Sequence, residues 1–564
     1  MFRYRRPLSL VSSLILVMGW LGHAQVREFK PVTDAMLQNP DPADWLNWRR
    51  TLDGWGYSPL DQINTENAHQ LQLTWSAIIG PGLSAPTPIV YNGIMYVTHP
   101  AGTLQALDAV TGDVVWDYTK QFETTKHNYP PRMRSMAIYG QNVYLATADA
   151  HIVALDARTG KVAWDHTVAD YKLGYRYTSG PIVVNGKVIA GMTGCEYYKN
   201  DVCFISAHDA DTGKELWRTT TIARPGEPGG ETWGDLPLTF RAGGDSWLPG
   251  TYDPKTNLTY WSTAQAKPWG RVSRGTDGDA LYTNSTLALD PQTGKMVWYH
   301  QFLPGETHDL DEVFENVLID HDGRSSLFKM GKLGILWELD RRTGKFTGAR
   351  DLGYQDVLEV DPGTGKATYR ADKIPKLGVP VDFCPGFQGV RNWRATAYHP
   401  QTQALYIPIT LGCQRSVFNA VEQKEGGGGY GLSGHRMLRG YPHPASPDHR
   451  GGFIAMNIKN GAILWRNPLT TSPTSAALTT GGGLAIVGDA SRYLYVYDVR
   501  TGKLLFRTRM PVPVQGFPIT YAVAGKQYLA IPVGTGGYIG EGTGSATATS
   551  PNAMYVFTLP ERAR

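Results

Sequence analysis

The stretch Ala106-Leu107-Asp108-Ala109-Val110-Thr111-Gly112, followed four residues later by Trp116, is the first of seven related copies along this chain of 564 residues. Three further copies keep all of its main positions: Ala154, Asp156, Thr159, Gly160 and Trp164; Ala207, Asp209, Thr212, Gly213 and Trp217; Ala288, Asp290, Thr293, Gly294 and Trp298. Three weaker copies run through Asp340-Arg341-Arg342-Thr343-Gly344, through Ala455, Asn457, Gly461 and Trp465, and through Asp498, Thr501, Gly502 and Phe506. A unit that recurs in this way predicts a repeat architecture.

The residue types in each copy predict a β-hairpin. An Asp or Asn at the turn can bond to the backbone two residues further on, and Gly allows the positive φ angle that such turns use. Alternating apolar residues on both sides of the turn are typical of paired strands. We expect the aromatic residue after each Gly to lie flat against the next unit, over the space that the small Ala leaves.

The spacing of the copies predicts the number of repeats. Most of the repeat glycines are 41 to 53 residues apart, the length of a four-stranded propeller blade. A gap of 81 residues between Gly213 and Gly294 indicates a blade with an insertion, and a gap of 117 between Gly344 and Gly461 leaves room for two blades, one without a recognisable copy. The chain is therefore predicted to be an all-β, eight-bladed β-propeller. We expect the strand near Met554 to Leu559 to pair with N-terminal sequence, because ring closure removes exposed strand edges.

The N-terminus has the pattern of a signal peptide. Arg3, Arg5 and Arg6 form a basic region, residues 8–21 are apolar, and residues 22–24 offer small side chains at the positions that a signal peptidase reads. We therefore expect a cleaved segment at 1–24 and a periplasmic protein whose residues 25–564 form a single propeller domain. The apolar stretch is short for a membrane span, and no later segment supplies one. A net charge of +4 without a basic tract argues against nucleic acid as a partner.

The chain has four cysteines, and in an exported protein these are expected to pair. Three connectivities are possible, and we favour the local one, Cys195–Cys203 with Cys384–Cys413. The sequence contains no Cys-x-x-Cys-His, the motif that attaches a c-type haem.

The repeat in an eight-blade chain resembles the tryptophan-docking motif of the PQQ-dependent methanol and ethanol dehydrogenase family. The opening and closing segments of that family are similar to Asp44-Trp45-Leu46, Tyr57-Ser58-Pro59-Leu60, and Lys526-Gln527-Tyr528 followed by Gly534 and Gly536. The resemblance implies a pyrroloquinoline quinone cofactor, a bound metal ion and the oxidation of an alcohol to an aldehyde or ketone.

The resemblance also implies a metal site. Gly191-Met192-Thr193-Gly194-Cys195-Glu196 is similar to the loop whose Glu binds Ca²⁺ in the family, and a hard cation prefers such oxygen ligands. Gln265 stands where the family has a ligand Asn, and its extra methylene puts this ligand in doubt. Asp309 matches the third ligand and general base, while Asp311 matches an extra Asp of lanthanide-using members. In a strand, residues i and i+2 point the same way, so both carboxylates could face one ion. Calcium is the expected metal, with a lanthanide ion as the alternative.

The same resemblance assigns the cofactor contacts. Arg134 matches an Arg that binds a carboxylate of the quinone, as a planar guanidinium can do bidentately. Trp247 matches the indole on which the ring system stacks, and Lys332 matches a cation near the reactive carbonyl. The remaining predicted contacts are Thr178, Thr193, Gly194, Cys195, Asp245, Asn392 and Trp393.

The implied reaction assigns catalytic roles to two of these residues. Asp309 removes the hydroxyl proton as a general base, and Lys332 stabilises the charge that develops on the quinone oxygens. Without a haem, electrons are expected to pass to a separate acceptor such as a c-type cytochrome. Two departures from the family suggest a wider pocket: Asn128-Tyr129 replaces a pair of adjacent cysteines, and Thr474 replaces a Trp that narrows the cavity.

Two other functions remain open from the sequence. A non-catalytic propeller could use the same repeats as a protein-binding scaffold of the cell envelope, since a fold does not by itself define a function. A sugar or polyol dehydrogenase could use the same cofactor.

Overall fold

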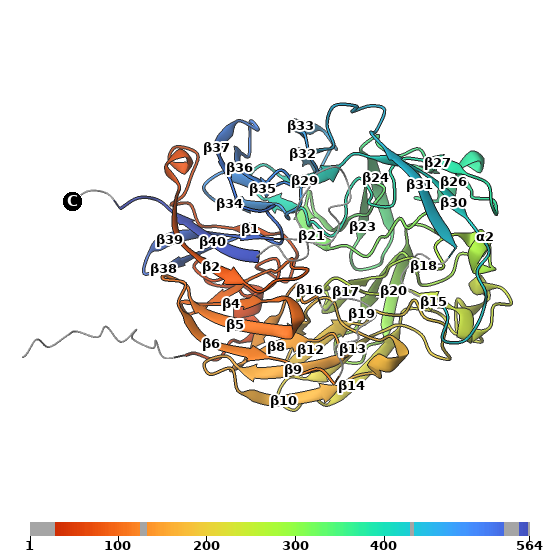
Figure 1. Cartoon of the computed structure of the whole chain (residues 1–564), viewed down its shortest axis with the longest axis horizontal. Coiled ribbons are helices and arrows are strands. Elements are labelled where there is room, and N and C mark those ends of the chain that lie inside the picture. The colour runs from red at the N-terminus through yellow and green to blue at the C-terminus, as the bar shows by residue number, and fades with distance from the viewer. Residues whose placement is uncertain (1–28, 124–131, 429–433, 535–551, 562–564) are drawn as a thin grey trace, which may run out of the picture.

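Eight blade-like sheets, each with four antiparallel strands and one of them with an added fifth strand, are present in the part of the chain that the structure, a computed structural model, describes: residues 29–123, 132–428, 434–534 and 552–561. The sheets follow one another around a ring (Figure 1). This arrangement confirms the predicted all-β, eight-bladed propeller. The predicted signal peptide, the pair Asn128-Tyr129 and Gly536 lie outside the described residues.

The first four blades follow the order of the chain. Blade 1 comprises β3 (Ile89–Tyr91), β4 (Ile94–Thr98), β5 (Thr103–Asp108) and β6 (Val114–Thr119). Blade 2 comprises β7 (Ala137–Tyr139), β8 (Asn142–Ala146), β9 (His151–Asp156) and β10 (Val162–Thr167). Blade 3 comprises β11 (Ile182–Val184), β12 (Lys187–Gly191), β13 (Phe204–Asp209) and β14 (Glu215–Thr220). Blade 4 comprises β16 (Thr251–Asp253), β17 (Leu258–Ser262), β19 (Ser285–Leu289) and β20 (Met296–Gln301).

The other four blades complete the ring. Blade 5 comprises β21 (Asn316–His321), β22 (Arg324–Met330), β23 (Ile335–Asp340) and β24 (Phe346–Asp351). Blade 6 comprises β28 (Ala397–His399), β29 (Ala404–Thr410), β32 (Gly451–Asn457) and β33 (Ile463–Leu469). Blade 7 comprises β34 (Leu478–Thr480), β35 (Leu484–Gly488), β36 (Tyr493–Asp498) and β37 (Leu504–Arg509), with β1 (Tyr57–Ser58) added in parallel beside β34. Blade 8 comprises β38 (Ile519–Val523), β39 (Lys526–Val533), β40 (Asn552–Thr558) and β2 (Gln72–Ile79).

Both ends of the chain build blade 8, which closes the ring. β2 pairs antiparallel with β40 from Gln72 opposite Thr558 to Ile79 opposite Asn552. The predicted pairing of the C-terminal strand with N-terminal sequence is therefore confirmed. A buried apolar cluster spans this closure, with Leu107 of blade 1, Leu494 of blade 7 and Val556 of blade 8 among its members.

The position of the unmarked blade was predicted wrongly. The 117 residues between Gly344 and Gly461 contain no additional blade among their described residues. They hold a hairpin of β25 (Leu358–Val360) and β26 (Ala367–Tyr369), and a sheet of β27 (Val381–Phe383), β30 (Cys413–Phe418) and β31 (His435–Tyr441). The unmarked blade is blade 8, because its outer strand comes from the N-terminus and interrupts the repeat along the sequence.

The repeat motif acts as predicted from its residue types. In blade 1, Oδ1 of Asp108 accepts hydrogen bonds from the backbone N–H groups of Val110, at 2.8 Å, and Thr111, at 3.0 Å. Trp116 lies opposite the small Ala106 in the strand register, and its indole donates to the carbonyl of Ala157 in blade 2 at 3.1 Å. Trp116 thus joins blade 1 to blade 2, and Trp298 of blade 4 likewise packs against Gly344 of blade 5.

The insertion predicted before Gly294 is also present. Between β14 and β19 the chain adds a two-stranded sheet of β15 (Ala242–Gly243) and β18 (Ala266–Lys267), the short helix α2 (Arg271–Arg274), and two 3-10 turns, η4 (Gly230–Trp233) and η5 (Leu238–Phe240). Before blade 1, a further short helix, α1 (Asp34–Gln38), begins after Thr33. The disulfides are Cys195–Cys203 and Cys384–Cys413, as predicted. In the described part of the chain, every helix is too short or too polar to span a membrane.

Candidate active site

A pocket of about 840 Å³, part of it open to solvent, gathers nearly all of the predicted site residues. Those that line it are Arg134, Thr178, Thr193, Glu196, Asp245, Trp247, Gln265, Asp309, Asp311, Lys332, Asn392 and Trp393. Gly194 and Cys195 do not line the pocket; they form the backbone beside it.

The lining residues come from loops at one face of the propeller. Some precede the first strand of a blade, such as Arg134 before β7 and Asp309 before β21. Others lie between the second and third strands, such as Glu196 after β12 and Lys332 after β22. In a four-stranded meander these two kinds of loop lie at the same end, because successive strands run in opposite directions. The ring therefore brings distant sequence segments together at one face.

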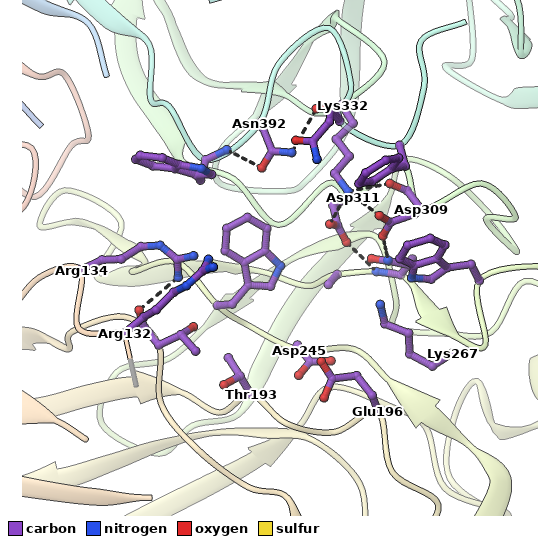
Figure 2. A pocket seen from close by; sticks show the side chains of 18 of the residues that line it. Arg132, Arg134, Thr193, Glu196, Asp245, Lys267, Asp309, Asp311, Lys332 and Asn392 are labelled. Atoms are coloured by element: carbon purple, nitrogen blue, oxygen red, sulfur yellow. Dashed lines mark hydrogen bonds and ion pairs between the residues drawn. The ribbon is translucent and has the colours of Figure 1, made fainter. Parts of the chain in front are cut away.

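Asp309 and Asp311 converge on one cation. Nζ of Lys332 lies 3.1 Å from Oδ2 of Asp309 and 3.0 Å from Oδ2 of Asp311, and it also donates to the backbone carbonyl of Asp309 at 2.7 Å (Figure 2). The two carboxylates share a direction, as predicted, but the strand that was expected to align them is absent. Residues 306–315 form an irregular loop in which Asp309 has φ +63°, and the carboxylate of Glu306 accepts the N–H groups of His308 and Asp309.

The φ of +63° places Asp309 in the left-handed region, where a residue with a Cβ is strained. Such strained residues cluster at functional sites. The electrostatics of Asp309 also suit a proton acceptor. Burial raises the pKa of Asp309 to about 7, while the Lys332 ammonium lowers it and the neighbouring Asp311 raises it. A carboxyl with this pKa can exchange a proton near neutral pH. The pKa of Lys332 is raised by Asp309 and Asp311 in spite of burial, so this cation stays charged.

Glu196 and Asp245 form a second pair of carboxylates. Burial and the charge of Glu196 raise the pKa of Asp245 to about 6, against the lowering effect of Lys267. Oδ1 of Asp245 accepts the backbone N–H of Cys195 at 3.1 Å. The disulfide-bonded turn at Gly194-Cys195 thus positions Asp245 beside Glu196, rather than contacting the pocket itself. Asp245 was predicted as a cofactor contact, and its place beside Glu196 also makes its carboxylate available as an oxygen ligand.

Within the part of the chain that the structure describes, two buried oxygen atoms of the pocket lack a hydrogen-bond partner. They are Oε1 of Gln265, whose residue is 1% exposed, and Oδ2 of Asp245. The other amide atom of Gln265, Nε2, donates to Asp309. Unpaired buried acceptors are costly, and oxygen atoms of amides and carboxylates are the ligands that a hard cation such as Ca²⁺ takes. The side chains of Gln265, Asp245, Glu196 and Asp309 therefore offer oxygen atoms of the kind that suits a metal ion.

The predicted set of three carboxylates is not drawn into one cluster. Among the described residues, the groups of acidic, His or Cys ligand atoms that lie within 4.8 Å of one another do not include Glu196, Asp309 and Asp311 together, nor Glu196 and Asp309 with Asp245. Instead, these carboxylates pair with separate cations. Nη2 of Arg176 lies 3.4 Å from both carboxylate oxygens of Glu196, and Lys332 holds Asp309 and Asp311.

The other end of the pocket carries arginines and an indole. The guanidinium carbon of Arg134 lies 5.2 Å from the centroid of the Trp247 ring, and its Nη1 donates to the carbonyl of Thr178 at 3.1 Å. Arg132 and Arg134 lie together, away from the acidic residues, in Figure 2. Oγ1 of Thr193 donates to the carbonyl of Arg176 at 2.7 Å, which leaves this oxygen able to accept. This end can hold an anionic group beside a flat surface.

Asn392 and Trp393 close the pocket from blade 6. Oδ1 of Asn392 accepts the backbone N–H of Trp393 at 2.8 Å, and its Nδ2 donates to the carbonyl of Gln388 at 3.0 Å. Thr474 does not line the pocket: it is buried, and its hydroxyl donates to the carbonyl of Val514. Thr474 therefore lends no support to the wider pocket expected from the sequence.

Sequence reasoning missed several lining residues. They are Arg132, Arg176, Ala264, Lys267, Trp269, Phe387 and Gln388. A signal was present for the cations, because Arg132 and Arg176 stand two residues before Arg134 and Thr178, and Lys267 stands two residues after Gln265. Alternate residues of an extended segment lie on the same side. Each cation could therefore have been predicted from the site residue two positions away.

The ring and its pocket define the class of this protein as an eight-bladed β-propeller whose pocket can hold an anionic, flat group. A match to the family described as "PQQ: Glucose/ethanol/alcohol dehydrogenase, beta-propeller domain" spans residues 45–347 and 374–529. The chain belongs to this family, which confirms the resemblance seen in its motifs.

The relatives and solved structures agree with this assignment. The quinohemoprotein alcohol dehydrogenase ADH IIB of Pseudomonas putida is 31% identical, over 94% of this chain and 79% of that protein. The quinoprotein alcohol dehydrogenase PedH of Pseudomonas putida KT2440 is 30% identical, over 95% of this chain and 93% of that protein. A europium-containing methanol dehydrogenase structure matches with a TM-score of 0.86 at 26% identity, over 93% of this chain and all of that one. The protein is thus an enzyme of the quinoprotein alcohol dehydrogenase family.

Proposed function

We propose that this protein is a periplasmic dehydrogenase that oxidises an alcohol to an aldehyde or ketone with PQQ and a bound calcium ion. One observation carries the proposal: a single pocket joins the carboxylate–lysine cluster of Asp309, Asp311 and Lys332 to the arginine–indole pair of Arg134 and Trp247. When bound, the quinone supplies a two-electron acceptor for the substrate hydride, and the metal ion supplies a Lewis acid.

The arginine end of the pocket would hold the quinone. PQQ carries carboxylates and a planar ring system, so it requires cations and a flat surface. Arg134 lies beside the Trp247 ring, and Arg132 lines the same end. Guanidinium groups bind carboxylates through paired hydrogen bonds, and an indole face packs against a planar ring.

Asp309 would act as the general base. Its side chain is buried at the acidic end, its pKa is raised to about 7 by burial, and Lys332 fixes the position of Oδ2. The substrate hydroxyl would lose its proton to this carboxylate. Lys332 remains charged beside it, so it can stabilise negative charge that develops on an oxygen within reach of its ammonium.

Calcium is the proposed ion, because its flexible coordination accepts an amide oxygen and several carboxylates. Glu196, Asp245, Gln265 and Asp309 offer such oxygens. The europium in the structurally similar methanol dehydrogenase keeps a lanthanide ion as the alternative.

Export and a separate electron acceptor complete the proposal. The basic and apolar pattern of residues 1–24 supports a periplasmic location, and two disulfides suit an oxidising compartment. These 564 residues contain no haem-attachment motif. We therefore propose that a c-type cytochrome takes the electrons.

Reconstitution tests this function. Metal-stripped protein is titrated with PQQ and Ca²⁺, and alcohol oxidation is followed with a dye as electron acceptor. Turnover is expected when both additions are present, and a chelator is expected to abolish it. Oxidation of alcohols with NAD⁺ in the absence of PQQ would contradict the proposal.

A further inference from the structure

Lys267 is a cation placed at the acidic end of the pocket. It ends the short strand β18, opposite Ala242 of β15, and it is 8% exposed. Its Nζ lies 5.3 Å from the centroid of the Trp269 ring, so the side chain is packed along the pocket wall. Both residues line the pocket.

The ammonium of Lys267 lies near two pairs of carboxylates, Glu196 with Asp245 and Asp309 with Asp311 (Figure 2). In Figure 2 it lies between the pair of Glu196 and Asp245 and the side chain of Asp309. Its charge acts on both Asp245 and Asp309. Within the described residues, however, no carboxylate oxygen lies within 4.0 Å of its Nζ, whereas Lys332 has two such partners.

The same space holds the oxygens that lack partners. Oε1 of Gln265 and Oδ2 of Asp245 are buried without hydrogen bonds, and both residues line the pocket with Lys267. An ion bound by these oxygens would therefore share the pocket with the Lys267 ammonium. Counting Arg176 and Lys332 with Lys267, three cations oppose the four carboxylates of Glu196, Asp245, Asp309 and Asp311.

We propose that Lys267 is a specificity-determining residue of the metal site, whose ammonium disfavours a trivalent ion relative to a divalent one. This inference rests on the proposed function, in which a metal ion binds at the acidic end. It opposes the effect of Asp311, whose extra carboxylate would favour a higher ionic charge.

The size of the effect follows from Coulomb's law. Repulsion grows in proportion to the charge of the ion, so the trivalent ion loses more affinity than the divalent ion. Two unit charges about 6 Å apart in an effective dielectric of about 20 change a binding constant on the order of 100-fold. The flexible lysine can move away from the ion, so we expect a selectivity change of at least about tenfold.

Direct metal titration tests the inference without measuring turnover. Metal-stripped protein with PQQ is titrated with Ca²⁺ by calorimetry and with Tb³⁺ by luminescence sensitised through tryptophan. Lys267→Met keeps the length of the side chain and removes its charge, while Lys267→Arg keeps the charge. Lys295→Met removes an exposed charge on the outer turn of blade 4 and serves as the remote control.

Lys267→Met is expected to raise the affinity for Tb³⁺ at least about tenfold more than that for Ca²⁺. Lys267→Arg and Lys295→Met are expected to keep the ratio of the wild-type protein. If Lys267→Met leaves the ratio unchanged while the wild-type protein binds Ca²⁺ and oxidises alcohols, this inference is wrong and the proposed function stands. If the wild-type protein with PQQ binds neither ion, both are wrong.

Discussion

Replacing Gly160 by alanine tests the contact that joins consecutive blades. Gly160 has φ +70°, and a Cβ at this position would meet Cε3 of Trp116 at 2.5 Å. The left-handed conformation costs a residue with a Cβ about 1–2 kcal/mol. An overpacked contact in a well-filled interior adds about 1–3 kcal/mol. Gly160→Ala is therefore expected to lower the free energy of unfolding by about 2–5 kcal/mol.

Gly323→Ala provides a matched control for this variant. Gly323 has φ +75°, and a Cβ there would have no atom within 4 Å. Its loss is expected to be the conformational cost alone, about 1–2 kcal/mol. Urea unfolding followed by far-UV circular dichroism and tryptophan fluorescence measures both variants. Equal losses in the two variants would show that the docked Trp116 ring tolerates the added methyl group, and would refute the account of how the blades are joined.

Three further predictions concern the site and the N-terminal segment. Asp309→Asn is expected to keep PQQ bound and to lower dye-linked turnover by at least about 100-fold. Asp448→Asn, at an exposed position, is the control, and a loss below about tenfold in Asp309→Asn would place the base elsewhere. Trp247→Ala is expected to weaken PQQ binding by about tenfold or more, through loss of ring stacking; fluorescence titration measures it, and an unchanged Kd would argue against stacking on Trp247. Burial raises the pKa of Asp53 to about 6. The folded state therefore binds the Asp53 proton more tightly than the unfolded state does, and this stabilises the fold. The stabilisation is full below about pH 4 and is lost as the pH rises through about 6. Asp53→Asn should flatten this slope in urea unfolding measured from pH 4 to pH 7, and a slope identical to that of the wild-type protein would contradict the assignment.

Local chemistry explains why the blades could be predicted. The Asp108 side chain bonds to backbone groups two and three residues away, and Gly112 has φ +81° at the same turn. Such contacts depend on neighbours in sequence, so each copy marks its own hairpin. The disulfide between Cys195 and Cys203 is equally local.

Local sequence patterns did not predict which segments form blade 8. The gap before Gly461 is filled by the short strands β25, β26, β27, β30 and β31. From the sequence alone these strands could not be told apart from the strands of a blade. The outer strand of blade 8 comes from residues near the N-terminus, about as far in sequence from β40 as the chain allows. Ring closure predicted that the C-terminal strand pairs with N-terminal sequence, but no repeat copy marks β2, β38, β39 and β40 as a blade of their own.

The sequence by itself determined the repeated hairpins, the docking tryptophans, the eight blades and, through family motifs, most of the residues that line the pocket. Only the tertiary structure decided which charges meet there. Arg176 reaches Glu196, Lys332 joins Asp309 to Asp311, and Lys267 stands between the two carboxylate pairs. The physical reason is that a turn is stabilised by residues adjacent in sequence, whereas the potential in a pocket is the sum over all nearby charges. Those charges come from different blades, and the ring alone sets the distances between them.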